Sequence, residues 1–251
     1  MSFDRSAEST AAMQPTAMRY AQLRSELDAL CARAGRNPAD VRLIAVSKTV
    51  GIAQVDQARA AGARDFAENR PDGLMEKHDA FPGDNWHFIG NIQSRRIRDI
   101  VGRATLIHSL CEVSHARKID AEAAALGIVQ DVLLEVNVSG EESKSGLAPA
   151  DVIAMLDECA ALSHMRVRGL MTMAPRGDAS RAREVFDELR RLRDELRIHL
   201  PADKAEVFDE LSMGMSEDWQ EAVFAGATMI RVGRAIFSDR FEEVRSDGVP
   251  V

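Results

Sequence analysis

Leu43-Ile-Ala-Val-Ser-Lys-Thr49 is the stretch of this sequence most typical of a strand, because four apolar residues run directly into three polar ones. Gly51 follows, and a short apolar run that stops before a glycine is typical of a buried strand. Lys48 stands at its end. A lysine there is either a solvated surface charge or an amine that condenses with a carbonyl, which needs a nitrogen whose pKa is lowered by its surroundings. The stretch alone leaves both interpretations open.

Seven more apolar segments of strand length accompany this one, and patterns of helical period separate them. The eight predicted strands are residues 41–46, 65–67, 86–89, 105–109, 129–136, 167–171, 207–211 and 229–232. The predicted helices between them are residues 52–61, 72–80, 94–101, 112–126, 149–162, 179–196 and 216–225. Eight strand-helix units in 251 residues favour an α/β fold in which parallel strands close into one (β/α)8 TIM-type barrel. An open doubly wound sheet is the alternative.

An amphipathic helix is predicted over residues 16–34, before the first strand, because apolar residues recur there at three- and four-residue spacing. No Gly/Ser-rich or Pro-rich linker divides the rest of the chain. We therefore expect one barrel domain over residues 16–245, a disordered polar tail at 1–15 and a C-terminal tail at 246–251. Within the domain, Arg70-Pro71-Asp72-Gly73 predicts a turn that delays or shortens the following helix, and residues 198–204 predict a loop.

The composition narrows the class of function. The formal net charge of −8 argues against a general nucleic-acid surface, and no apolar run reaches the length of a membrane span. The N-terminal residues lack the apolar core of a signal peptide. Cys31, Cys111 and Cys159 are widely spaced and odd in number, which is typical of reduced thiols, and the histidines show no spacing typical of metal ligands. We expect a cytoplasmic protein that binds no metal, nucleic acid or membrane.

Two loops near the C-terminus have the character of an anion site. In a barrel of this kind, the reacting groups sit at the C-terminal ends of the strands, and a phosphate often binds in the loops after strands seven and eight. Those loops are Ser212-Met-Gly-Met-Ser216 and Arg231-Val-Gly-Arg-Ala-Ile-Phe237. Gly214 and Gly233 either let backbone N–H groups approach an anion or merely permit tight turns. Lys48 would face the same mouth.

Ser216 has a competing role, because Glu217 and Asp218 follow it as in a helix N-cap with an acidic first turn. These two acids would repel a phosphate from the start of that helix. We therefore assign the anion to Ser212 and to the loop around Gly233.

Seven segments carry a resemblance to a known family. They are LIAVSKT (43–49), AEN (67–69), WHFIGNIQS (86–94), IHSL (107–110), LLEVNVSGEESKSGL (133–147), RGLMTMAP (168–175) and FDELSMGMSEDWQEAVFAGATMIRVGRAIF (208–237). These segments resemble the YggS/PROSC family of pyridoxal 5′-phosphate (PLP)-binding proteins, whose fold is similar to the barrel domain of alanine racemase. The resemblance implies a protein that binds PLP and buffers or delivers it in the cell, with no established catalytic reaction.

The resemblance also implies roles for single residues. Lys48 would hold the cofactor as an internal aldimine, Asn69 would lie near its ring, and Arg231 would face the pyridine nitrogen. Ser212 and the loop around Gly233 would bind the phosphate. The residues assigned to the cofactor are Lys48, Asn69, Met171, Ser212, Gly214, Arg231, Gly233 and Arg234.

The position that the resemblance implies for Arg231 has a direct chemical consequence. A guanidinium only donates hydrogen bonds and stays charged, so a ring nitrogen that faces it must accept and stay unprotonated. An unprotonated pyridine is a poor electron sink, which disfavours carbanion chemistry at a bound amino acid.

The sequence departs from the family pattern at several positions. Ala67 stands where the family usually has glycine, Cys111 where it has aspartate, and Arg234 where it has a small hydroxyl residue. The last departure bears on the phosphate loop. Arg234 either tightens the grip on phosphate through a bidentate contact or points outward.

Two enzyme hypotheses stand beside the binding hypothesis. A two-base racemase of this type needs a second acid/base, in alanine racemases a tyrosine, and the only tyrosine here is Tyr20 in the predicted first helix. The alternative is a slow PLP-dependent racemase or eliminase with His87 or Cys111 as a helper. The second alternative is an aldolase-type barrel that uses Lys48 as a Schiff base on a sugar phosphate. The expected partners are PLP and, transiently, PLP-dependent apo-enzymes, and the resemblance suggests a monomer.

Overall fold

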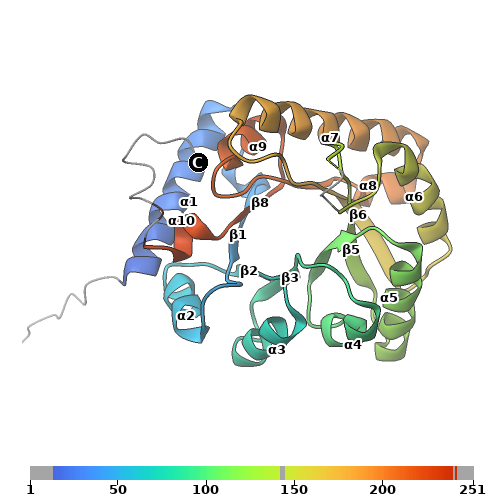
Figure 1. Ribbon diagram of the computed structural model, residues 1–251, viewed down its shortest axis with the longest axis horizontal. Coiled ribbons are helices and arrows are strands. Elements are labelled where there is room, and N and C mark those ends of the chain that lie inside the picture. The colour runs from blue at the N-terminus through green and yellow to red at the C-terminus, as the bar shows by residue number, and fades with distance from the viewer. Residues whose placement is uncertain (1–13, 142–144, 240, 242–251) are drawn as a thin grey trace, which may run out of the picture.

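The centre of the molecule is a closed barrel of eight parallel strands, in a computed structural model that describes residues 14–141, 145–239 and 241. The strands are β1 (Arg42–Val46), β2 (Asp65–Glu68), β3 (Asn85–Phe88), β4 (Leu106–Leu110), β5 (Gln130–Glu135), β6 (Met165–Met171), β7 (Glu210–Ser212) and β8 (Met229–Val232). Each strand pairs with the next along the chain, and β1 pairs with β8 to close the ring (Figure 1). The predicted (β/α)8 barrel is confirmed, and the open doubly wound sheet is wrong.

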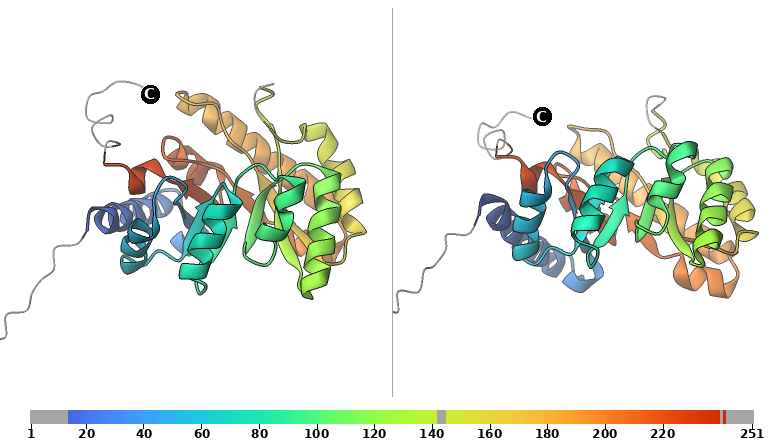
Figure 2. Two further views of the ribbon diagram at one scale, coloured as in Figure 1. Left: turned by 60° about the horizontal axis from the view of Figure 1, so that its bottom comes forward. Right: turned by 90° about the horizontal axis from the view of Figure 1, so that it is seen from below.

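Helices form a layer outside the strands (Figures 1 and 2). The α-helices are α1 (Pro15–Arg33), α2 (Ile52–Ala60), α3 (Pro71–Ala80), α4 (Ile97–Ile100), α5 (Val113–Leu126), α6 (Val152–Ala160), α7 (Ala179–His199), α8 (Ala202–Val207), α9 (Trp219–Ala225) and α10 (Arg234–Phe237). Short 3-10 turns are η1 (Pro38–Asp40), η2 (Ser94–Arg96) and η3 (Pro149–Asp151). The leading helix α1 packs against α2 and α10, so it completes the outer layer beside β1.

The helix after β2 begins earlier than the sequence predicts. α3 starts at Pro71, because a proline at the first helical position has no N–H to lose and its fixed φ suits a helix. Residues 70–73 therefore begin the helix without the predicted delay, and the predicted turn is wrong.

The connection from α7 to β7 also differs from the prediction. α7 runs to His199 and α8 begins at Ala202, so most of the loop predicted at residues 198–204 is helical. Because α8 continues to Val207, β7 starts only at Glu210 and is shorter than the strand predicted for residues 207–211. The short β7 still reaches Ser212, the residue predicted to lie near the mouth.

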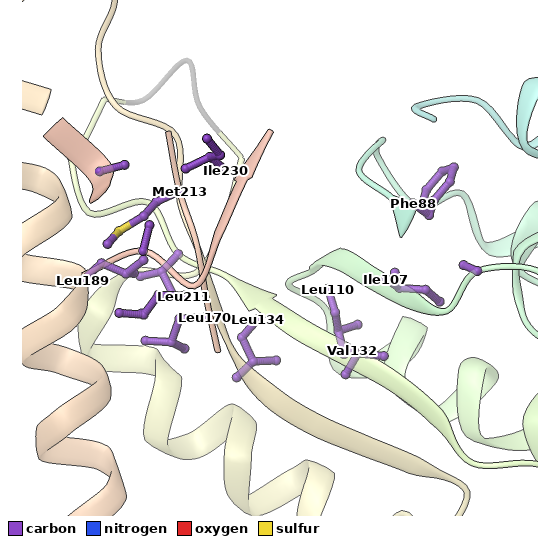
Figure 3. Packing of buried hydrophobic residues seen from close by; sticks show 14 of the residues in the cluster. Phe88, Ile107, Leu110, Val132, Leu134, Leu170, Leu189, Leu211, Met213 and Ile230 are labelled. Carbon is purple, nitrogen blue, oxygen red and sulfur yellow. The ribbon is translucent and has the colours of Figure 1, made fainter. Parts of the chain in front are cut away.

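Alternate strand residues point away from the barrel axis and pack under the helices. Leu134 of β5 pairs in register with Leu170 of β6, which in turn pairs with Leu211 of β7. All three are fully buried in the same cluster as Leu189 of α7 (Figure 3). Burying one leucine side chain contributes about 1.5–3 kcal/mol to stability, so this layer holds the strand ends firmly in place.

The other strand residues line the barrel interior. Its apolar residues are Ile44, Val46, Ala67, Leu106, Leu133, Met171 and Met229. Buried polar side chains on the same alternation are His87, His108, Glu135, Ser212 and Arg231. A packed barrel interior leaves little room for water, so these polar groups must find partners among themselves.

Two expectations concern the ends of the chain and membranes. The predicted tails at residues 1–15 and 246–251 lie outside the described residues, except for residues 14 and 15, and α1 already begins at Pro15. Within the part of the chain that the structure describes, no helix is long and apolar enough to span a membrane.

Candidate functional site

Lys48 lies just beyond the C-terminal end of β1 and is exposed to solvent. The strand ends at Val46, and a turn follows in which the Val50 N–H donates to the Ser47 carbonyl (3.0 Å). Side chains alternate along a strand, so Lys48 has the parity of Ile44 and Val46, which face the barrel interior. The amine therefore leaves the chain on the side of the barrel mouth.

The turn that carries Lys48 rests on three buried polar residues, Ser47, Glu68 and Lys77, which we call the Lys77 network. The Ser47 hydroxyl donates to Glu68 Oε1 (2.6 Å), and Lys77 Nζ of α3 forms an ion pair with the same carboxylate. Lys77 Nζ also donates to the Ser47 carbonyl (2.8 Å). Glu68 and Lys77 are only 2% and 3% exposed, so each charge depends on the other. The network fixes the backbone immediately before Lys48.

Asn69 follows β2 at the mouth and is half-buried. Its backbone is held against Gly90, where a Cβ atom would lie 1.9 Å from the Asn69 carbonyl oxygen. The Ser109 hydroxyl donates to the Gly90 carbonyl (2.6 Å) and holds this glycine from the other side. Only glycine fits at position 90, and this close contact sets the position of Asn69.

Arg231 of β8 is a buried cation beneath the mouth, 4% exposed. Its Nη1 donates to Ser212 Oγ (2.6 Å), and its Nη2 donates to the Thr172 carbonyl (3.0 Å). Burial lowers the pKa of the guanidinium to about 10, and the charges of Asp218 and Glu135 act in the opposite direction. Arg231 therefore stays charged at neutral pH.

Arg231 is also one end of a row of hydrogen-bonded residues, Asp65, His87, His108, Ser212 and Arg231, which we call the Arg231 chain. Ser212 Oγ lies 2.8 Å from His108 Nδ1, and His108 Nε2 lies 2.9 Å from His87 Nδ1. His87 Nε2 in turn lies 3.3 Å from Asp65 Oδ1. The two imidazole rings and the Ser212 side chain are fully buried.

The position of Ser212 bears on the predicted phosphate site. Its hydroxyl lies in the barrel interior, between Arg231 and His108. The hydroxyl that lies at the loop after β8 is that of Ser216, 3.3 Å from the Ala235 N–H. The structure therefore brings Ser216, and not the Ser212 hydroxyl, to this loop.

The N-cap role predicted for Ser216 is wrong. Ser216 is not the N-cap, because α9 starts at Trp219 and Asp218 precedes it. Asp218 Oδ1 accepts from the Met215 N–H (2.5 Å), and Glu217 forms an ion pair with Arg234. Both acids are engaged in local bonds, which weakens their repulsion of an anion.

The two glycines of these loops differ. Gly214 has a φ of +91°, and a Cβ atom there would lie 2.5 Å from the Ala222 Cβ of α9, so this glycine is needed for a tight, packed turn. Gly233 precedes α10, and a Cβ atom there would lie 3.1 Å from the Val46 carbonyl oxygen. The loop around Gly233 is therefore packed against the end of β1, two residues before Lys48.

Arg234 and Met171 complete the predicted set. The Arg234 side chain is half exposed, pairs with Glu217 and lies over the Phe241 ring. Of the two alternatives for Arg234, this geometry is the outward one. Met171 of β6 is part of the apolar interior cluster and is buried.

Comparisons with known proteins agree on the family. The model of the alanine racemase N-terminal domain matches residues 18–240. A pyridoxal phosphate homeostasis protein of Pseudomonas aeruginosa is 40% identical over 91% of this chain and 97% of its own length. The protein of the same name from Escherichia coli K12 is 34% identical over 91% of this chain and 98% of its own. This chain belongs to the family of pyridoxal phosphate homeostasis proteins.

Solved structures extend this result. PipY of Synechococcus elongatus, solved with PLP bound, is 36% identical, with a TM-score of 0.77 over 89% of this chain and 100% of its own. An alanine racemase of Clostridium difficile superposes with a TM-score of 0.67 at 13% identity, over 87% of this chain and 56% of its own, and this likeness concerns the fold alone. The homeostasis family thus shares its barrel with a larger enzyme.

In this member of the homeostasis family, two polar groups near the mouth have shifted pKa values. Burial raises the pKa of Glu135, while a hydrogen bond from Ser145 (2.9 Å) and the charge of Arg231 lower it less strongly. Burial and the charges of Glu135 and Glu112 raise the pKa of the Cys111 thiol to about 11. Cys111 is thus a protonated thiol at neutral pH and a weak nucleophile.

Sequence patterns did not reveal the Lys77 network, nor the hydrogen bonds that join Asp65, His87 and His108 to Ser212. A signal was available in part, since strand alternation gives His87 and His108 the inward parity of their neighbours. Lys77 carried no such signal, because its partner Glu68 lies on another element. Among the described residues, no group of three His, Cys, Asp or Glu side chains could hold a metal ion.

Proposed function

We propose that the protein binds PLP at the mouth of the barrel through an imine to Lys48, and that it buffers the cofactor or delivers it to other proteins. The observation that carries this proposal is the junction of two loops. Lys48 leaves the end of β1 two residues beyond Val46, and the Gly233 loop packs directly on Val46. An amine and an anion-compatible loop therefore meet at one point, above a buried guanidinium.

The donor groups at the mouth fit the chemistry of PLP. When bound, PLP supplies an aldehyde to which an amine adds, a phosphate dianion and a ring nitrogen. The exposed amine of Lys48 is accessible to the aldehyde. The loop around Gly233 and the neighbouring Ser216 hydroxyl, which accepts from the Ala235 N–H, offer N–H and O–H groups to the phosphate. Arg231 offers only N–H donors to the ring nitrogen. We assign these three roles to Lys48, the Gly233–Ser216 pair and Arg231, with Asn69 beside the ring.

The same residues favour storage over catalysis. A ring nitrogen that accepts from Arg231 stays unprotonated and withdraws electrons poorly. Tyr20 lies in α1 and lines a pocket at the N-terminal ends of the strands, together with Arg42 and Asp65. It is therefore at the opposite end of the barrel from the mouth. The other proposed helpers are His87, which is bonded to Asp65 and His108, and the protonated thiol Cys111.

The PLP homeostasis relatives and PipY support this proposal, because the chain covers nearly all of their length. We further propose that the protein acts as a cytoplasmic monomer that passes PLP transiently to PLP-dependent apo-enzymes. An exposed Lys48 supports exchange, since an incoming amine needs access to the imine carbon.

The first experiment compares absorbance spectra of the wild type, Lys48→Ala and Lys118→Ala after addition of PLP. Lys118 is an exposed lysine on α5, outside the barrel, and serves as the matched control. The wild type and Lys118→Ala should show the visible band of a lysine–PLP imine, and borohydride should fix the label on Lys48. A colourless wild type, or a Lys48→Ala variant that keeps the band, would contradict the proposal.

Transfer needs its own test. PLP-loaded protein is mixed with a PLP-dependent apo-enzyme while an aldehyde trap removes free PLP, and recovery of the apo-enzyme's activity is followed. Reactivation that persists under the trap supports delivery, whereas reactivation that stops under it limits the function to buffering. Steady turnover of D- or L-amino acids by the loaded protein would instead support the enzyme alternative.

A further inference from the structure

The Arg231 chain crosses the barrel from one end to the other. Its five residues come from five strands: Asp65 from β2, His87 from β3, His108 from β4, Ser212 from β7 and Arg231 from β8. Asp65 is the first residue of β2 and therefore lies at the N-terminal face, while Ser212 is the last residue of β7, at the opposite face. The chain thus joins the two faces through the packed interior.

The two ends of the chain carry opposite charges. Arg231 has only N–H donors. Burial raises the pKa of the Asp65 carboxyl, but hydrogen bonds from His87 and Asn85 and the charge of Arg42 outweigh it, so the pKa falls below its ordinary value. Asp65 is therefore an ionised carboxylate that only accepts, and it borders a surface pocket of about 530 Å³.

The groups between the ends are neutral. Burial lowers the pKa of His87, against its hydrogen bond to the Asp65 carboxylate, and burial together with the positive charge of Arg231 lowers the pKa of His108 well below its ordinary value. A neutral imidazole has one N–H and one acceptor nitrogen, so each ring can pass on the direction of a hydrogen bond but cannot reverse it.

These facts fix the direction of every bond. Because Asp65 only accepts, His87 Nε2–H donates to it, and His87 Nδ1 is then an acceptor. His108 Nε2–H donates to that nitrogen, which leaves His108 Nδ1 as an acceptor for the Ser212 hydroxyl. Ser212 Oγ in turn accepts from Arg231 Nη1. All four bonds point from the mouth toward Asp65.

A chain with one direction has two consequences. The single hydrogen of the Ser212 hydroxyl is committed to His108, so Ser212 has none to donate to a phosphate oxygen. Hydrogen bonds aligned head to tail polarise one another, so the negative charge of Asp65 strengthens the bond that Ser212 accepts from Arg231.

We propose that Asp65, His87, His108 and Ser212 are positioning residues for Arg231, which together orient its guanidinium toward the ring nitrogen of the bound cofactor. This inference rests on the proposed function. It assigns Ser212 to the arginine and leaves the phosphate to Ser216 and the Gly233 loop. It also means that a substitution at the far face of the barrel changes the surroundings of a cofactor at the mouth.

The first test needs no cofactor. Nitrogen-15 NMR of the imidazole rings in the PLP-free protein reports which ring nitrogen carries the proton. His87 and His108 should both be neutral Nε2–H tautomers at neutral pH. An Nδ1–H tautomer or a cationic ring at His87 or His108 would overturn the inference.

The second test uses the PLP-loaded protein and the variant Asp65→Asn, which keeps the size of the side chain and removes its charge. Without this negative charge, positive charge near Arg231 is stabilised less, so bound PLP should lose its proton at lower pH. The pH at which the absorbance of bound PLP is halfway through its change should therefore fall by about 0.5 pH unit.

Asp131→Asn is the matched control for the second test. Asp131 lies at the start of β5, and its side chain is about as exposed as that of Asp65. It pairs with Arg166 (2.7 Å) and Arg168, which do not belong to the Arg231 chain. Its variant should leave the midpoint unchanged. Equal shifts in both variants, or no shift in Asp65→Asn, would overturn the inference.

The two proposals fail in different ways. If the wild type forms no imine with PLP, the proposed function fails, and with it the role of the chain toward a cofactor, even when the NMR confirms its direction. If PLP binds normally but Asp65→Asn behaves as Asp131→Asn does, the proposed function stands and only the positioning role fails.

Discussion

The molecule contains two sets of buried polar side chains, and they are built differently. In the Lys77 network, between the barrel and α3, the opposite charges of Glu68 and Lys77 touch, and both bind Ser47. In the Arg231 chain, inside the barrel, the charges of Arg231 and Asp65 stand at opposite ends, with neutral groups between them. Both satisfy the rule that buried polar groups need partners.

The difference lies in what each arrangement can do. A closed pair of charges acts locally, and the Lys77 network fixes the backbone of one turn, the turn that carries Lys48. An open row of neutral groups carries an orientation over a distance, because each hydrogen bond dictates the direction of the next. The barrel therefore uses an ion pair to hold its amine-bearing turn and a directed chain to hold its buried cation.

The largest effect is expected from breaking the closed network. Lys77→Met would leave the Glu68 carboxylate buried without its cation, and removal of one partner of a buried ion pair costs about 3–5 kcal/mol. The free energy of unfolding, measured by urea denaturation, should fall by this amount. The double variant Glu68→Leu/Lys77→Met should recover part of the loss, since no unpaired charge remains. If Lys77→Met alone lowers the free energy of unfolding by no more than the loss of an exposed ion pair would, Glu68 and Lys77 do not form the buried ion pair.

A smaller loss is expected from interrupting the open chain. His108→Phe would leave the Ser212 hydroxyl and His87 Nδ1 without their partner, which costs about 1–3 kcal/mol. The exposed His199→Phe is the control and should change the free energy of unfolding by no more than about 0.5 kcal/mol. Equal costs in the two variants would mean that the chain contributes nothing to stability.

The chain also predicts a pH dependence. The pKa values of His87 and His108 lie below the ordinary 6.5 in the folded protein, so the unfolded chain binds more protons as pH falls below 6.5. Stability should therefore fall with falling pH, by up to about 1.4 kcal/mol per pH unit for each histidine. Glu135 works in the opposite direction nearer its ordinary pKa of 4.5, because its pKa is raised in the folded protein.

Urea denaturation at several pH values between 6.5 and 5.5 would measure this slope. His108→Phe should reduce it, since one buried neutral imidazole is removed. A wild-type stability that stays constant or rises over this interval would contradict the assignment of both rings as neutral.

The smallest effect is expected outside both sets. Arg234 and Glu217 form an ion pair at the mouth, but the Arg234 side chain is half exposed. Pairs of this kind contribute about 0–1 kcal/mol, so Arg234→Ala should change the free energy of unfolding little. This small change should become smaller still at high salt, because salt screens the ion pair. A loss of stability as large as that of Lys77→Met would mean that burial does not explain why the Glu68–Lys77 pair contributes more than the Arg234–Glu217 pair.

Much of the fold was predictable, because strands and helices are set by local patterns. Each predicted strand overlaps an observed one, and β1 differs from its prediction by a single residue. The errors arose where local signals conflict. Pro71 lies in a predicted turn but in fact begins helix α3, and helix α8 includes Val207, the first residue of the strand predicted at residues 207–211.

The site was predictable only in part. The proposed roles of Lys48 and the Gly233 loop follow from their places at strand ends, and that of Arg231 follows from the family resemblance; all three are predictions that the cofactor experiments test. The role of Ser212 was predicted from its place in the chain, and its hydroxyl instead lies against Arg231 and His108. Sequence position places both serines in the segment after the seventh strand and could not distinguish the hydroxyl of Ser212 from that of Ser216.

The sequence by itself determined the strand-helix alternation, the inward parity of the interior residues and the family of the chain. Only the tertiary structure decided that Asp65, His87, His108, Ser212 and Arg231 form one chain. The physical reason is that hydrogen-bond partners are chosen by distance, and closure of the barrel with a particular register brings together residues as far apart in sequence as His108 and Ser212. A local pattern contains no information about that register.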